Sequence, residues 1–358
     1  MKKIIPVLAI LALCFSACKV EFSPNAPWRD VPVVYCVLDP QEDTVWARVQ
    51  HAYLSESNFY DYSQISDSNY YGKDDIEVYL LAWKGISGPY FSYTPSNQLV
   101  DRWKLSYTIR EGKPEGDFPS GGQPVYYCVP GKRLVKDTDC VFQLVVVKTS
   151  TGDTIAQAYT TMVGFIRPTI RQRDTIEEVL IEPNGYPKCY GFVTSNHGKI
   201  RWQTLPRGRL YQPLVRFFYR KGTDTLSVDI PSGDNIRNEY NYPELTTSNP
   251  SQTRFLSIIK NALSDNTDSL FNVNYVDIFI YACNEDLNAY ITSLNSSSLG
   301  GQEYQPYTNI EGGVGVFGSR RSHIITRVAC DSTGKEGYLP SQLYNLGVGF
   351  YGNFTPAK

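Results

Sequence analysis

Strand-length segments in which apolar and polar residues alternate are the feature that most limits how this chain can fold. Residues 44–50 place Val45 and Val49 on one side of a strand and Trp46 and Arg48 on the other. Such a period of two is typical of a β-strand with one buried face. Similar segments recur along the first half of the chain, separated by turn residues, and they predict a mainly β fold.

The clearest hairpin runs from Cys140 to Met162, with the turn at residues 150–153. Its Gly-Asp tip resembles the closing hairpin of immunoglobulin-like modules. We therefore predict that residues 28–165 form an immunoglobulin-like β-sandwich of about seven strands.

Residues 166–358 mix strands with two short helices. Asn249 is predicted to cap the first helix, since a proline follows it. Asn284 is predicted to cap the second, whose first turn carries Glu285 and Asp286 at the positive end of the helix dipole. Strands are predicted at residues 199–203, 214–219, 276–281, 312–319 and 324–328. The pattern indicates an α+β domain with a mixed or antiparallel sheet.

The N-terminus has the layout of a bacterial lipoprotein signal, because a basic start, an apolar run and two small residues precede Cys18. We predict that residues 1–17 are a signal peptide, that Cys18 carries fatty acyl chains such as palmitate, and that residues 18–27 are a tether. Lys19, rather than an aspartate, favours the outer membrane but leaves the surface and periplasmic leaflets open. The alternative is an ordinary cleaved secretion signal.

Composition excludes few function classes. The chain has 34 basic and 36 acidic residues, for a formal net charge of −2, so charge gives no case for nucleic-acid binding. Its 27 tyrosines suit either the faces of β-sheets or a surface that binds glycan or peptide.

Six cysteines remain besides Cys14 and Cys18, an even number that permits disulfides in an exported protein. Cys128 and Cys140 are the easiest pair to join, since they flank a polar stretch between two predicted strands. Free, buried cysteines are the alternative.

The late segments of the chain resemble a known family. The apolar run 276–281, the short helix with Tyr290, and the segment 306–319, which contains Asn-Ile-Glu-Gly-Gly-Val-Gly-Val-Phe, carry the likeness. They resemble uncharacterised outer-membrane lipoproteins of Bacteroidota in the domain-of-unknown-function family 4249. The resemblance implies a lipoprotein that is sometimes found near TonB-dependent transporters, and it implies no catalytic residues.

No motif predicts a reaction. The glycines at 312–315 lack the Gly-Lys-Ser/Thr ending of a phosphate loop and predict a tight turn before a buried strand. His51, His197 and His323 lie far apart, so no metal site or other cofactor is predicted. There is no Gly-x-Ser-x-Gly elbow.

Paired acids and clustered arginines have both structural and functional interpretations. The pairs at 74–75, 177–178 and 285–286 are expected to be solvated faces or helix starts rather than a glycosidase pair. A series of arginines could contact acidic sugars or lipid head groups, or could pair with acids along strands. These are Arg167, Arg171, Arg173, Arg201, Arg207, Arg209, Arg216 and Arg220.

We therefore predict a non-catalytic, lipid-anchored outer-membrane protein that acts as a binding or accessory module, with a TonB-dependent barrel and a glycan or peptide as candidate partners. The alternative is a periplasm-facing scaffold of an envelope or motility assembly, and a glycan hydrolase ranks third. The binding residues are not identified by sequence. Aromatic residues expected to be exposed on strands are Trp46, Tyr70, Tyr71 and Trp83.

Overall fold

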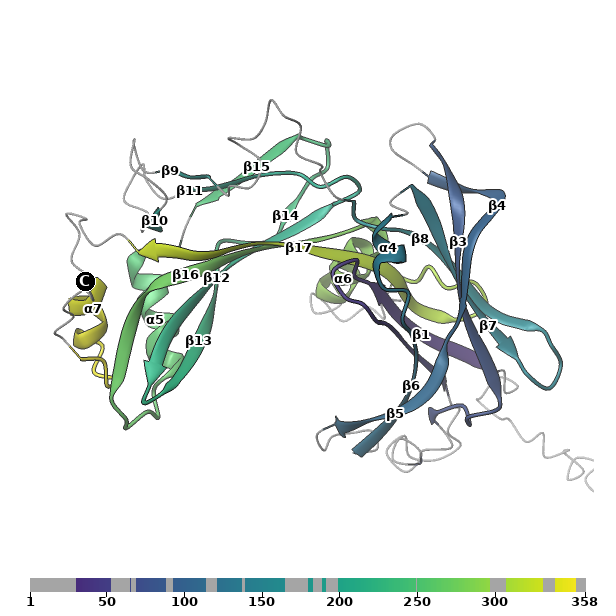
Figure 1. The fold of residues 1–358 in the computed structure, drawn as a ribbon, viewed down its shortest axis with the longest axis horizontal. Coiled ribbons are helices and arrows are strands. Elements are labelled where there is room, and N and C mark those ends of the chain that lie inside the picture. The colour runs from purple at the N-terminus through teal and green to yellow at the C-terminus, as the bar shows by residue number, and fades with distance from the viewer. Residues whose placement is uncertain are drawn as a thin grey trace, which may run out of the picture.

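The strands gather into one large mixed sheet and two smaller antiparallel sheets, as Figure 1 shows. The computed structural model describes residues 30–52, 65, 69–87, 93–113, 121–136, 139–164, 180–182, 189–190, 199–248, 250–296, 307–330 and 339–351. The prediction of a mainly β fold with a few short helices is confirmed.

Two sheets pack face to face in the N-terminal lobe. The first has the order β4 (Tyr93–Lys104), β3 (Ile76–Ser87), β7 (Cys140–Lys148) and β8 (Thr154–Thr161). The second is one end of the ten-stranded sheet, with β1 (Val31–Leu38), β2 (Val45–Ala52), β6 (Gly121–Cys128) and β5 (Ser106–Lys113). Alternate side chains of both sheets, such as Leu38 and Leu80, are fully buried in one shared core.

The C-terminal lobe continues the same ten-stranded sheet. Its strands follow the order β13 (Asp224–Pro231), β12 (Leu210–Lys221), β16 (Leu270–Cys283) and β17 (Val314–Cys330). Short strands β14 (Ile236–Arg237) and β10 (Cys189–Tyr190) pair with β12 and β17, and a separate sheet holds β15 (Glu244–Ser248), β11 (Lys199–Gln203) and β9 (Leu180–Glu182). The described helices are α4 (Lys132–Lys136), α5 (Gln252–Ala262), α6 (Glu285–Ser296) and α7 (Leu339–Asn345).

Helix α5 begins later than predicted. Its N-cap is Ser251, whose hydroxyl accepts a hydrogen bond from the backbone N–H of Arg254 at 3.3 Å. The predicted cap, Asn249, lies outside the described residues. A serine side chain satisfies one of the first helical N–H groups as well as asparagine does, so the sequence contained two competing cap signals.

Strand β17 joins the two lobes. It runs parallel to β1 through its first residues and antiparallel to β16 through its later ones, so the two strands predicted at 312–319 and 324–328 are one strand. Phe317 is buried in the N-terminal core, whereas Val328 belongs to the C-terminal core. Met162 belongs to the N-terminal core and Val163 to the C-terminal core, close to the predicted boundary after residue 165. The N-terminal core also includes residues of β17, from the C-terminal half of the chain.

Glycines allow β17 to approach β1 closely, as the glycine-rich segment predicts. Gly315 has a φ of +116°, and a Cβ at this position would overlap the carbonyl oxygen of Val34. An added Cβ on Gly313 would likewise overlap the carbonyl oxygen of Pro32. Side chains at either position would therefore separate the two strands.

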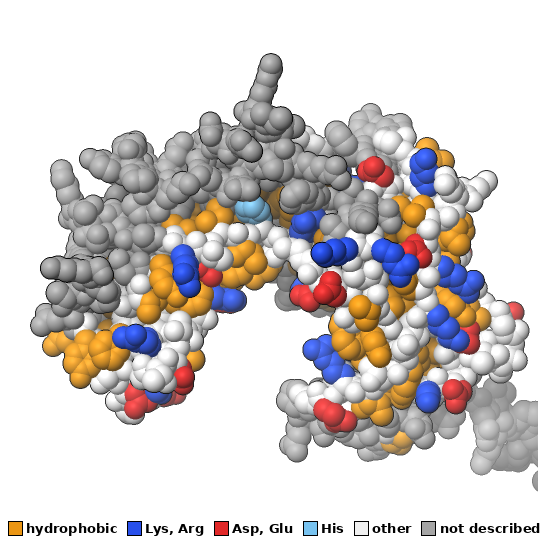
Figure 2. All heavy atoms as spheres, in the orientation of Figure 1, with side chains coloured by type: hydrophobic (Ala, Val, Ile, Leu, Met, Phe, Trp, Pro, Cys, Tyr) orange, Lys and Arg blue, Asp and Glu red, His pale blue; other side chains and the backbone are white. Residues whose placement is uncertain are grey.

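Both cores lie on one face of the ten-stranded sheet. Phe317 and Ile325 stand eight residues apart on β17, so they point to the same face, and they contact the N-terminal and C-terminal cores respectively. We call the opposite face the outer face. Figure 2 shows an open notch between the two lobes, and in Figure 1 β1, β5 and β6 lie on the notch side of their lobe.

Candidate functional site

The outer face of the N-terminal lobe collects aromatic and basic side chains. The register places Tyr35 of β1 beside Arg48 of β2, and Trp46 of β2 beside Tyr127 of β6. Directly opposed residues on neighbouring strands point to the same face of a sheet, so these four side chains form one surface. Trp46 is 40% exposed, as the sequence predicts.

A pocket of about 440 Å³ opens on this surface, and we call it the Trp46 pocket. It is lined by Tyr35, Trp46, Ala47, Arg48, Arg110, Glu111, Gly112, Gln123 and Val125. The guanidinium carbon of Arg110 lies 5.4 Å from the centroid of the Trp46 ring, and the ring of Tyr127 lies 5.3 Å from it. Its volume lies within the range of small-ligand sites.

Arg48 lies at the side of the pocket with spare hydrogen-bonding capacity. Its guanidinium carbon is 4.9 Å from the Tyr35 ring centroid, and among the described residues its buried Nε has no hydrogen-bond partner. Within the same residues, neither Arg48 nor Arg110 forms an ion pair with a carboxylate. A guanidinium without a carboxylate partner can bind the oxygens of an anionic ligand.

Helix α6 supports this wall of the pocket. The rings of Tyr35 and Tyr290 meet edge to face, with centroids 6.1 Å apart. Burial and a hydrogen bond with Tyr35 raise the pKa of Tyr290 to about 12, so the phenol is neutral at physiological pH. The contact fixes the Tyr35 ring, on which Arg48 in turn stacks.

The start of α6 is anchored by a polar network that joins the lobes. The side-chain NH₂ of Asn284 donates to the Thr160 hydroxyl at 2.7 Å and to the carbonyl of Thr161 at 3.0 Å. Its Oδ1 accepts from the backbone N–H of Leu287 at 3.2 Å and from that of Ser319 at 3.0 Å. Asn284 therefore caps α6, as predicted, and also ties the helix to β8 and β17.

Asp286 completes this network. Its carboxylate accepts hydrogen bonds from Thr160 at 2.8 Å and from the Tyr307 hydroxyl at 3.1 Å. Burial nevertheless raises the pKa of Asp286, and these bonds oppose the rise only in part. Because its oxygens are bound by neighbours, we interpret Asp286 as a structural group rather than as a general acid.

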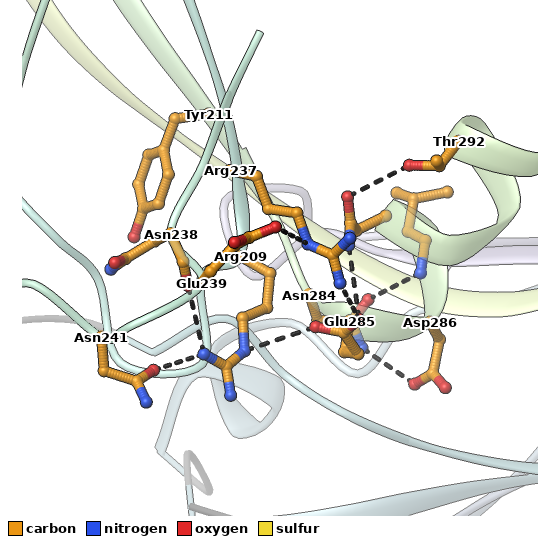
Figure 3. A network of polar contacts seen from close by, with 12 residues as sticks. Arg209, Tyr211, Arg237, Asn238, Glu239, Asn241, Asn284, Glu285, Asp286 and Thr292 are labelled. Atoms are coloured by element: carbon orange, nitrogen blue, oxygen red, sulfur yellow. Dashed lines mark hydrogen bonds and ion pairs between the residues drawn. The ribbon is translucent and has the colours of Figure 1, made fainter. Parts of the chain in front are cut away.

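Its neighbour Glu285 points to the other side of the helix start, as Figure 3 shows. It forms ion pairs with Arg209 at 3.4 Å and with Arg237 at 3.3 Å, while Arg209 also donates a hydrogen bond to Asn241. Glu285 and Asp286 therefore have separate partners, which agrees with a helix start and not with a glycosidase pair.

A second cleft of about 440 Å³ lies at the start of β1, lined by Asp30, His51, Tyr71, Asp74, Asp75, Lys148, Thr149 and Ser150. The hydroxyl of Tyr71 donates to Asp30 at 2.7 Å, and Lys148 lies 3.6 Å from the same carboxylate. The Asp75 carboxylate accepts from the backbone N–H of Gly72 at 2.7 Å. Asp30 and Asp75, two of the three acids named here, are thus bound by neighbours. Tyr71 is buried, so the prediction that it is exposed is wrong.

The described arginines of the predicted series do not form one basic surface. Arg207 lies 3.9 Å from Asp139, Arg216 makes two hydrogen bonds to Asp229 at 2.6 and 2.9 Å, and Arg220 stacks on an aromatic ring. This supports the structural interpretation for these residues. Arg167, Arg171, Arg173 and the side chain of Arg201 lie outside the described residues.

The predicted disulfide between Cys128 and Cys140 is not present. Both residues are buried thiols at the ends of β6 and β7, which belong to the two facing sheets. Facing sheets lie about 10 Å apart, whereas a disulfide needs Cα atoms within about 7 Å. Burial raises the pKa of the Cys128 thiol to about 12. Cys18, the predicted lipidation site, lies outside the described residues.

Among the described residues, no group of three or more His, Cys, Asp or Glu side chains could hold a metal ion. His197 lies outside them. None of the helices described combines the length and apolar character needed to span a bilayer.

Sequence reasoning found part of the pocket. It placed Trp46 and Arg48 on one side of a strand, but it did not select Arg48, Arg110, Gln123 or Tyr290 as site residues. Those residues come together only through the pairing of β2 with β6 and of β6 with β5, and through the packing of α6. The alternation within residues 106–113 was the available signal, since it sets Arg110 opposite Ile109.

Comparison with known proteins gives no further guide. Neither family models nor the sequences of curated proteins match this chain. The resemblance to outer-membrane lipoproteins of Bacteroidota therefore stays a prediction.

Proposed function

We propose that this protein is a non-catalytic, lipid-anchored binding module of the outer membrane, which holds a ligand in the Trp46 pocket. The observation that carries the proposal is the exposed ring of Trp46 beside Arg48 and Arg110, neither of which forms an ion pair with a carboxylate among the described residues. An aromatic platform with adjacent unpaired donors is suited to holding a polar ligand.

Membrane attachment through Cys18 would keep this pocket close to the envelope. The resemblance to outer-membrane lipoproteins suggests an accessory role beside a TonB-dependent barrel, in which the module captures a ligand and presents it for uptake. The acyl chains on Cys18 would make this tether essentially permanent.

Two measurements test the proposal. Intact cells are treated with a protease that cannot cross the outer membrane, and the protein is then detected by blotting, with Cys18→Ala as the control for anchoring. We expect cleavage on intact cells and release of the Cys18→Ala protein from membranes. Protection until lysis would exclude capture at the cell surface.

The second measurement is a binding screen of the purified protein against an array of glycans and peptides. We expect bound ligands to be lost with Trp46→Ala and kept with Tyr240→Ala, which alters an aromatic residue that is 74% exposed elsewhere. Equal binding by both variants would show that the Trp46 pocket is not the site.

A periplasm-facing scaffold is the second candidate, and the C-terminal part of the outer face favours it. Ile324 is 43% exposed there, beside Phe279, which stacks on Tyr281 with ring centroids 5.7 Å apart. Phe279 itself is 7% exposed, with the Arg216 guanidinium 4.6 Å from its ring centroid. An exposed apolar side chain on a sheet face can contact a protein partner. Protection from external protease, together with loss of a co-purifying protein in Ile324→Asp, would select this function.

A further inference from the structure

We propose that the ligand of the Trp46 pocket is a carboxylated sugar, a uronic acid within an oligosaccharide, with its carboxylate between Arg48 and Arg110 and its ring against Trp46. This inference rests on the proposed function and adds the chemical class of the ligand. Two properties of the pocket lead to it: its charge and its aromatic surface.

The charge favours an anion. Arg48 and Arg110 both line the pocket, and neither pairs with a described carboxylate. Among the described lining residues the only acid is Glu111, whose carboxylate lies over Gly122 beside Ile109, on the opposite side of β5 from Arg110. The planar fork of a guanidinium matches the two oxygens of a carboxylate.

The aromatic surface favours a sugar ring. Trp46 lines the pocket and its ring contacts that of Tyr127, with centroids 5.3 Å apart at an interplanar angle of 33°. The apolar face of a sugar ring can pack on an exposed indole. Gln123 stands directly across from Arg110 and supplies an amide that can both donate to and accept from hydroxyl groups. A volume of about 440 Å³ leaves room for one or two sugar rings.

The pocket lies where β2 and β6 separate. The two strands pair only through residues 45–47 and 126–128, and β5 is the edge strand of the sheet, so the backbone does not exclude an added peptide strand. The choice of a sugar therefore rests on the side chains of the lining, and hexaglutamate serves below as the peptide probe.

The test uses the purified protein and isothermal titration calorimetry with short oligogalacturonates, the same oligosaccharides as methyl esters, and hexaglutamate. Methyl esterification keeps the sugar rings and removes the charge. We expect binding of the oligogalacturonate, at least tenfold weaker binding of the ester, and weakening of the complex as salt is raised.

Substitutions test whether the two arginines bind the carboxylate of the sugar. Arg48→Gln and Arg110→Gln should each raise the dissociation constant for oligogalacturonate about tenfold or more. Arg102→Gln is the matched control, because Arg102 lies 4.4 Å from the Tyr79 ring centroid on a strand of the other sheet. Circular dichroism checks that each variant is folded. Arg110 is exposed, so if Arg48→Gln unfolds, the Arg110→Gln variant still tests the proposal.

The outcomes separate this inference from the proposed function. Equal affinity for acid and ester, or binding unaffected by either arginine substitution, overturns the carboxylate and leaves a pocket for neutral sugars. Tighter binding of hexaglutamate overturns the sugar. No binding of any of the three probes overturns the inference, while the array with Trp46→Ala still decides whether the pocket binds at all.

Discussion

Asn284→Ala should be among the most destabilising single substitutions in this protein. The residue is 1% exposed, and removal of its side chain leaves the N–H groups of Leu287 and Ser319 without this acceptor. It also takes one hydrogen bond each from Thr160 and Thr161, which keep their bonds to Asp286 and to the Ser319 hydroxyl. A buried polar group left without a partner costs about 1–3 kcal/mol. Loss of the cap adds about 1 kcal/mol. Since entering water recovers some of these bonds, we expect a total loss of about 3–5 kcal/mol.

Ser251→Ala is the matched control, because Ser251 also caps a helix but makes only the capping bond to Arg254. We expect this variant to lose about 1 kcal/mol. Both are measured by urea unfolding, followed by tryptophan fluorescence, since tryptophans lie in both lobes, for example Trp103 and Trp202. Equal losses in the two variants would refute the reasoning, because the network would then add nothing to the cap.

Three further predictions follow from backbone geometry and titration. Gly315→Ala should lower the melting temperature far more than Gly347→Ala, which has a positive φ but open space around it and should cost about 1 kcal/mol; equal shifts would contradict the close approach of β17 to β1. The raised pKa of Asp286 means that the folded state binds its proton more tightly than the unfolded state, so stability falls as pH rises from the ordinary value of 3.8 through the folded pKa. Asp286→Asn should remove this fall, and an unchanged pH profile would contradict it. Cys128 and Cys140 should react with a thiol reagent at pH 8 only after unfolding, and mass spectrometry of the digested protein should find no peptides joined by a disulfide. A peptide that links Cys128 to Cys140 would show that the disulfide predicted from the sequence forms.

Local patterns predicted local structure well. The hairpin of β7 and β8 and the cap at Asn284 depend on neighbours in sequence, and the structure has both where they were predicted. The predicted start of α5 was wrong because serine and asparagine, two good N-cap residues, occur within three residues of each other.

Long-range pairing was not predictable from the same patterns. The register of Tyr35 with Val316 joins residues that are far apart in the chain, and nothing in either segment specifies its partner. The disulfide prediction for Cys128 and Cys140 was wrong for the same reason. The two residues are close in sequence, but their strands belong to different sheets. The pocket also depends on long-range pairing, because Arg110 on β5 lies beside Trp46 on β2 only when both strands flank β6.

One consequence of β17 is that the two lobes should not be independent. Phe317→Ala empties a fully buried site in the N-terminal core and should cost about 3–5 kcal/mol. Because the same strand continues into the C-terminal sheet, we expect faster hydrogen exchange in β3 and also in β16. Phe142→Ala is the control, since Phe142 is equally buried in the N-terminal core but lies on β7, which has no part in the ten-stranded sheet. It should loosen β3 and leave β16 less affected. If both variants change exchange in β16 to the same extent, β17 does not couple the lobes.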